Sequence, residues 1–135
     1  MLFLLDSNAF SDLMRKHPGV QRRFAALGAD DRIAISTTVR GEIVYGLERL
    51  PTGRRRDELS RQAQELFAVL RSEAVPVAAA DAYARIKLNR QQQGLSLDEN
   101  DLWIAATALA LDATLVTRDS DFDSLEEITV VDWSA

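Results

Sequence analysis

Four acidic residues occupy positions from which their side chains can meet in space. Asp6 and Asp119 each follow a short strand-like run, whereas Glu42 and Asp101 stand in or near the first turns of two helical patterns. In a parallel sheet the carboxyl ends of the strands share one edge, and the helices that follow begin there. We therefore expect these four carboxylates to converge, although they are scattered along the chain.

Converging carboxylates indicate a divalent metal site, because they repel one another unless a cation neutralises them. The chain has no cysteine and a single histidine, His17, so the site would have oxygen ligands only. Such a set suits the hard cations Mg²⁺ and Mn²⁺. One ion can lower the pKa of a bound water beside a phosphodiester, and a second can stabilise the leaving oxygen.

Each acid also has an ordinary structural interpretation. Asp6 is a good candidate for a helix N-cap, and Glu42 for an exposed surface residue. Asp101 can complement a helix dipole, a role that suits its neighbours Asp98 and Glu99 better. Asp101 also shares its helix face with small apolar side chains, where a carboxylate needs a partner or a metal ion.

Asp119, Asp121 and Asp123 form an alternating acidic run after the strand-like segment. Alternating acids can imitate a calcium-binding loop, but the EF-hand pattern needs a central glycine that this run lacks. A solvated turn is the ordinary interpretation. One or two of these acids can still reach the strand edge where Asp6 is expected.

The elements that must position these acids alternate between strands and helices. Apolar runs predict strands at residues 2–5, 32–36, 75–77, 114–117 and 128–131, with Pro76 placing the third at an edge or a strand end. Helical patterns fill residues 9–15, 18–27, 39–50, 53–70, 79–93 and 99–111, with Gly94 stopping the fifth helix and a capping box at 96–99 starting the sixth. The alternation predicts an α/β fold with a mostly parallel central sheet flanked by helices.

Composition sets broad limits on the protein. A chain of 135 residues corresponds to about one domain, here residues 1–135. The net charge of −5 does not indicate nucleic-acid binding by itself, yet 14 of the 16 basic residues are arginines, which grip phosphate well. The lack of cysteine suits a reducing cytoplasm. No stretch is apolar enough for a membrane helix, so no membrane association is expected.

Basic and histidine side chains compete for a functional role. His17 precedes Pro18 and is expected at an exposed helix entry, so a catalytic triad lacks its base. Residues 54–56 with Arg61 form the densest basic patch, which we expect to be a solvated helix face rather than an RNA contact. Arg118, beside Asp119, is a better candidate for touching substrate or neutralising the site.

Aromatic side chains are a further alternative. Trp103, Trp133, Phe67 and Tyr83 have rings on which nucleobases can stack. Aromatic residues at helical spacing more often belong to a core or a dimer interface, and we expect that role for all four.

Four short motifs resemble one known family. Residues 4–8 read LLDSN, 35–43 read ISTTVRGEI, 100–106 read NDLWIAA and 115–122 read LVTRDSDF. In this order and spacing they resemble the motifs of PIN domains, most closely the VapC-type toxins of bacterial toxin–antitoxin pairs. The resemblance covers essentially the whole chain and implies a single PIN-like domain.

The resemblance implies roles for particular residues. Asp6, Glu42, Asp101 and Asp119 would be the catalytic, metal-binding acids. Asp121 would be an auxiliary acid that could share or replace the role of Asp119 as the fourth metal ligand. Asn8 and Thr117 match polar positions that support such a site. Members of the family are Mg²⁺- or Mn²⁺-dependent ribonucleases that form homodimers. They are silenced by a cognate VapB-type antitoxin, often through an antitoxin arginine that enters the acidic pocket.

The leading hypothesis is therefore a metal-dependent endoribonuclease toxin that acts on RNA. One alternative is a phosphatase that uses Asp6 as its nucleophile. A haloacid-dehalogenase-like enzyme would carry a second aspartate at position 8, where this chain has Asn8. Another alternative is a catalytically silent module whose acidic pocket receives a partner's arginine, or that binds DNA in a regulatory complex.

Overall fold

The computed structural model describes residues 1–135, which alternate between strands and helices along the chain. The elements are β1 (Leu2–Leu5), α1 (Ser7–Met14), α2 (Pro18–Ala25), β2 (Arg32–Ser36), α3 (Thr37–Glu48), α4 (Arg54–Val69), β3 (Arg71–Glu73), α5 (Ala78–Gln92), α6 (Glu99–Ala110), β4 (Thr114–Val116), a 3₁₀ turn (Ser120–Phe122) and β5 (Thr129–Val131).

The five strands form one sheet in the order β3-β2-β1-β4-β5, and every neighbouring pair is parallel. The α/β fold predicted from the alternation of elements is thus confirmed. Leu5 at the end of β1 pairs with both Ile35 of β2 and Val116 of β4. This register places the next residues, Asp6, Ser36 and Thr117, side by side at the carboxyl edge of the sheet.

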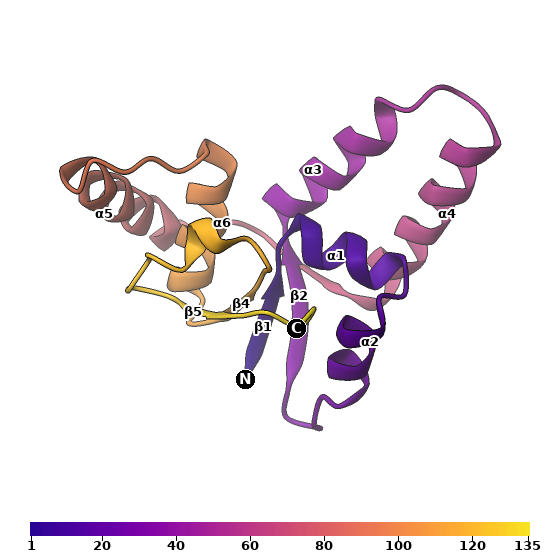
Figure 1. Cartoon of the computed structure of the whole chain (residues 1–135), viewed down its shortest axis with the longest axis horizontal. Coiled ribbons are helices and arrows are strands. Elements are labelled where there is room, and N and C mark those ends of the chain that lie inside the picture. Colours follow the sequence, from indigo (N-terminus) through magenta and orange to yellow (C-terminus); the bar gives the residue numbers. More distant parts are fainter.

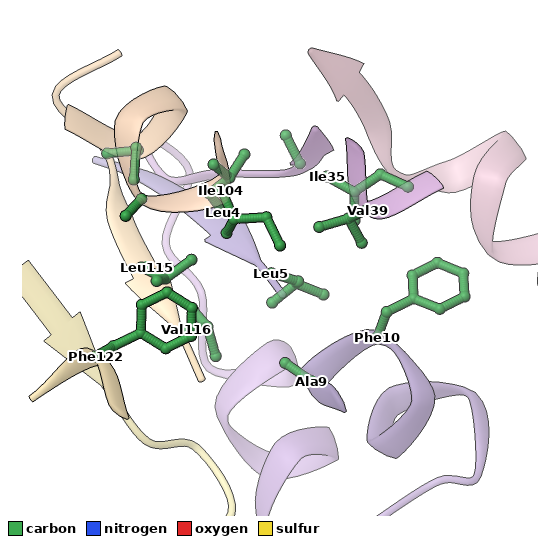
Figure 2. Close-up of a cluster of buried hydrophobic side chains, with 14 of the residues drawn as sticks. Leu4, Leu5, Ala9, Phe10, Ile35, Val39, Ile104, Leu115, Val116 and Phe122 are labelled. Carbon is green, nitrogen blue, oxygen red and sulfur yellow. The ribbon is translucent and has the colours of Figure 1, made fainter. Parts of the chain in front are cut away.

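The central strands are buried on both faces, as expected for parallel strands between layers of helices. The consecutive residues Leu4 and Leu5 of β1 are both fully buried. In β4, Leu115 and Val116 have at most 1% of their surface exposed. Figure 2 shows these side chains packed with others from the neighbouring helices, among them Phe10 of α1. All 27 buried hydrophobic residues belong to this one cluster, so the sheet edge is carried on a single rigid core.

The helices gather in two groups around the sheet. Figure 1 shows α5 and α6 together at one end of the molecule and α1, α2 and α4 at the other. Between them α3 rises from the end of β2, pairs with α4, and carries the connecting loop away from the sheet (Figure 1). No helix combines the length and the apolar character needed to span a membrane.

The third strand lies upstream of its predicted position. β3 comprises Arg71–Glu73, which pair with β2, whereas Val75 and Pro76 lie outside any strand. The prediction at 75–77 was wrong because it followed the apolar residues. This edge strand is short and polar, and Pro76 has no N–H to donate to a ladder.

The start of α6 also differs from its prediction. Its N-cap is Asp98, whose side chain accepts a hydrogen bond from the backbone N–H of Asn100 over 3.1 Å. The predicted capping box from Ser96 to Glu99 is absent because Glu99 instead accepts hydrogen bonds from Tyr83 and Lys87 of α5. At the end of α5, Gly94 adopts the predicted left-handed conformation, with φ +71°.

Candidate functional site

Asp6 is the most deeply placed acid of the site. It follows β1 directly and caps α1, where its Oδ1 accepts a hydrogen bond from the backbone N–H of Ala9 over 2.8 Å. Its side chain is buried, with 4% of the residue exposed. Burial raises the pKa of Asp6, the hydrogen bonds from Thr117 and Ala9 lower it, and the charges of Asp119 and Glu42 raise it further.

Thr117 connects two of the predicted acids. It follows β4, and its hydroxyl donates to Asp6 Oδ2 over 2.5 Å. The same Oγ1 accepts a hydrogen bond from the backbone N–H of Asp119 over 3.0 Å. Asp119 in turn caps the 3₁₀ turn by accepting from the backbone N–H of Asp121. The register of β1 against β4 therefore sets where Asp119 lies relative to Asp6.

Glu42 is held by contacts from two other elements. Ser7 at the start of α1 donates its hydroxyl to Glu42 Oε1 over 2.6 Å. Asn100 of α6 donates to Glu42 Oε2 over 3.4 Å. Glu42 is half-buried rather than an exposed surface residue, so the structure gives it a defined position between α1 and α6.

Asp101 lies in the first turn of α6, and its side chain makes no hydrogen bond to any protein group. Burial raises its pKa to about 7, and the charges of Asp98, Glu42, Asp119 and Asp6 add to the effect. The three other predicted acids thus lie near enough to disfavour ionisation of Asp101. The convergence expected from the sequence is present, and Asp6 and Asp101 serve as a cap and a first-turn acid as well.

Asp121 and Asn8 stand apart from this group. Both residues are exposed, and neither uses its side chain in a hydrogen bond. Asp121 meets the site only through its backbone N–H, which donates to Asp119. The structure therefore brings Asp6, Glu42, Asp101, Asp119 and Thr117 together but does not add Asp121 or Asn8 to them.

The donor set fits a hard divalent cation in its chemistry. It consists of carboxylate oxygens, and after burial and the charge of Asp98 the other three acids raise the pKa of Asp101 further. In this arrangement no three acidic or histidine side chains lie close enough together to hold a metal ion. An ion held by a few carboxylates with waters completing its shell is the usual arrangement for Mg²⁺.

Arg118 does not neutralise the acidic group as the sequence suggested. Its Nε donates to Asp12 Oδ2 over 3.0 Å, and Arg15 donates to the other oxygen of Asp12 over 2.7 Å. Asp12 is buried, with 5% of its side chain exposed. It was missed in the sequence because it sits in the middle of α1, where an isolated aspartate resembles a surface residue.

The remaining basic candidates have structural roles. His17 is a half-buried N-cap of α2, and its Nδ1 accepts from the backbone N–H of Gly19. Arg61 forms ion pairs with Glu58 and Glu65 on the exposed face of α4, as expected for a solvated patch.

The aromatic residues pack mainly against one another. Phe67 stacks on Phe10 in the core, and Trp133 packs against Phe3. Tyr83 stacks on Trp103 with ring centroids 4.2 Å apart, joining α5 to α6. Their expected structural role within the fold is confirmed.

The chain is similar to known proteins. The sequence profile of the PIN domain matches residues 3–128. The chain is 28% identical to Ribonuclease VapC2 of Rickettsia felis, over 98% of each protein. It is 31% identical to Ribonuclease VapC5 of Mycobacterium tuberculosis, over 71% of this chain and 70% of that protein.

Solved structures give the same result for the fold. The crystal structure of VapBC2 from Rickettsia felis, bound to a DNA fragment from its promoter, contains a chain that superposes with a TM-score of 0.89. The two chains are 25% identical, and the match covers 98% of this chain and 99% of that one.

Proposed function

The chain belongs to the PIN-domain family, among its VapC-type members, and we propose that it is a metal-dependent endoribonuclease toxin of a VapBC-type toxin–antitoxin pair. The proposed reaction is hydrolysis of an RNA phosphodiester. The proposed cofactor is Mg²⁺ or Mn²⁺, held by Asp6, Glu42, Asp101 and Asp119.

The observation that carries this proposal is the convergence of four acids from separate elements. Burial and the charge of Asp98 raise the pKa of Asp101 most, and repulsion from the other three acids raises it further. Such repulsion is relieved when a divalent cation binds between the carboxylates. A divalent cation bound there would lower the pKa of a water molecule and stabilise the charge that develops on the phosphate.

The residues of the chain have distinct tasks in this proposal. Asp6 is fixed by Thr117 and Ala9, and each carboxylate oxygen retains a further lone pair for a ligand. Glu42 is oriented by Ser7 and Asn100. Asp101 has no protein partner and is therefore the acid most free to bind a cation. These contacts preorganise the site, which is what electrostatic catalysis requires.

A phosphatase with Asp6 as nucleophile is disfavoured by the same contacts. Both oxygens of Asp6 already accept hydrogen bonds from the protein, and the side chain is buried. Position 8, where a haloacid-dehalogenase-like enzyme has its second aspartate, is an exposed asparagine. An attacking carboxylate needs an oxygen that faces the phosphorus atom.

The partners are proposed by analogy with the relatives. A VapB-type antitoxin is proposed because the similar solved chain comes from a VapBC complex. A homodimer and a cytoplasmic location remain predictions from the family resemblance. Asp121 and Asn8 are proposed only as auxiliary residues, since their side chains contact none of the four acids.

Cleavage of RNA by the purified chain tests the proposal. We expect cleavage in Mg²⁺ or Mn²⁺, none in EDTA, and loss of cleavage in Asp6→Asn and Asp101→Asn. Asp81→Asn, an exposed acid on α5, is the matched control and should cleave normally. Cleavage that continues in EDTA would contradict metal dependence. Full activity of both site variants would remove these acids from the mechanism.

A further inference from the structure

A polar groove runs along α3 directly beside Glu42. It has a volume of about 480 Å³, and Asn100 of α6 also lines it. Thr38, Glu42, Tyr45 and Arg49 line it at intervals of four, three and four residues, which places them on one stripe of the helix. The groove therefore includes a proposed catalytic acid and extends along α3 to Arg49.

Two glycines keep this face of α3 open. Gly41 and Gly46 both line the groove, and a Cβ added to either would meet no atom within 4 Å. Glycine lowers helix stability relative to alanine, so helix formation does not explain its presence at two positions of one helix. The glycines leave room for a flat or bulky group between Glu42 and Tyr45.

Tyr45 is placed as a stacking platform. It is 63% exposed, and it is the only hydrophobic residue among those that line the groove. The guanidinium of Arg49 lies 5.1 Å from the centre of its ring. An exposed aromatic ring next to an arginine is the arrangement with which proteins bind unpaired nucleobases, by stacking and cation–π contact.

Arg49 supplies the charge that a phosphate needs. It forms no ion pair with any carboxylate, although the chain has a net charge of −5. The other arginines near the site lie outside the groove: Arg118 pairs with Asp12, and Arg40 lies over the ring of Phe67 and donates to Ser72. Arg49 is the only basic residue lining the groove.

We propose that this groove is a nucleotide subsite for single-stranded RNA, in which a base stacks on Tyr45 and Arg49 contacts the adjoining phosphate. The subsite lies next to the acidic group and positions the strand for cleavage, and in this respect it rests on the proposed function. A groove with one hydrophobic residue lacks the apolar centre that the fully buried part of a protein interface has.

Binding of fluorescein-labelled single-stranded RNA tests the subsite without any cleavage. Fluorescence anisotropy is measured with oligo(A) and oligo(U) of about ten nucleotides in EDTA. Loss of the ring in Tyr45→Ala should weaken binding at least about fivefold, since stacking contributes ~1–3 kcal/mol per base. Tyr45→Phe keeps the ring and should bind like the wild type. Arg49→Gln should weaken binding and lower its dependence on salt.

Arg85→Gln removes an exposed arginine from α5 and is the control for charge. Wild-type affinity in both Tyr45→Ala and Arg49→Gln, or no RNA binding by the wild type, would overturn the subsite. A changed oligomeric mass of Tyr45→Ala with unchanged RNA affinity would also overturn it and mark a protein interface.

RNA binding through Tyr45 without cleavage in Mn²⁺ would refute the proposed function alone. Cleavage with no effect of either variant on binding would refute the subsite alone.

Discussion

The hydroxyl of Thr117 donates a 2.5 Å hydrogen bond to Asp6 across a sequence separation of 111 residues. It joins the ends of β1 and β4, which pair in the sheet so that Leu5 lies opposite Val116. Because Thr117 also accepts from the backbone N–H of Asp119, one side chain aligns two of the proposed metal ligands. The geometry of the site therefore depends on strand register.

Replacing Thr117 with valine should weaken both the fold and the site. Asp6 is buried and would lose one of its two hydrogen bonds from the protein. Such a loss costs about 1–3 kcal/mol of the free energy of unfolding, measurable by urea denaturation. The rate of RNA cleavage should fall as well, because the backbone N–H of Asp119 would lose its hydrogen bond to Thr117 Oγ1.

Two variants control for this effect. Thr117→Ser keeps the hydroxyl and should retain most of the stability and activity. Thr114→Val changes a buried threonine of β4 whose side chain makes no hydrogen bond, and it should leave cleavage unchanged. If Thr117→Val cleaves RNA as fast as Thr117→Ser, the hydrogen bond to Asp6 does not position the site.

Asp101 should make stability depend on pH when no metal ion is present. Its pKa is about 7 in the folded chain, against roughly 3.9 when unfolded. Between these values the folded state binds more protons than the unfolded state, so stability falls as pH rises from about 4 to about 7. Above that range Asp101 is charged in both states and the loss is complete.

Asp101→Asn should therefore be more stable than the wild type at pH 8 in EDTA, with the difference shrinking toward pH 4. Thermal unfolding, monitored by circular dichroism, measures the stability of the two proteins at each pH. Addition of Mg²⁺ at pH 8 should raise the Tm of the wild type more than that of the variant, since a ligand stabilises the state that binds it. Equal pH profiles of the two proteins in EDTA would contradict the raised pKa of Asp101.

The ion pair between Asp12 and Arg118 should contribute to stability because one partner is buried. Arg118→Ala leaves the carboxylate of Asp12 with Arg15 as its only cation. Since a hydrogen bond to a charged group contributes roughly 1.5–3 kcal/mol, we expect destabilisation toward the low end of that range for this half-exposed arginine. Arg85→Ala, which removes an exposed arginine, should cost much less.

A double-mutant cycle separates the interaction between Asp12 and Arg118 from the other effects of each substitution on stability. The cost of Asp12→Asn should be smaller in the Arg118→Ala background than in the wild type, because the interaction is already lost. Strict additivity of the two substitutions in urea denaturation would show that the pair does not couple α1 to the segment after β4.

The sequence predicted the sheet well wherever burial controlled it. The apolar residues of β1 and β4 identify central strands, and the acids that follow them identify the carboxyl edge. β3 was misplaced because Arg71–Glu73 form an exposed edge strand, which needs no apolar pattern. Its position is set by pairing with β2, a contact between distant segments that local composition does not encode.

The candidate site was predictable in its acids but not in its supporting contacts. Asp6 and Asp101 could be found from strand and helix patterns, and Glu42 and Asp119 from the family motifs. Ser7 and Asn100 were not identified as partners of Glu42, because both contacts join segments far apart in the chain. Arg118 was assigned to the acidic group by adjacency, whereas its side chain reaches back to α1.

Binding of Mn²⁺ tests the central claim most directly, namely that acids from four separate elements form one metal site. Electron paramagnetic resonance of a Mn²⁺ titration at pH 8 counts bound ions without requiring an RNA substrate. We predict saturable binding by the wild type, strong loss in Asp6→Asn and Asp101→Asn, and no change in Asp81→Asn. Wild-type binding by both site variants, or no saturable binding by the wild type, would contradict the account.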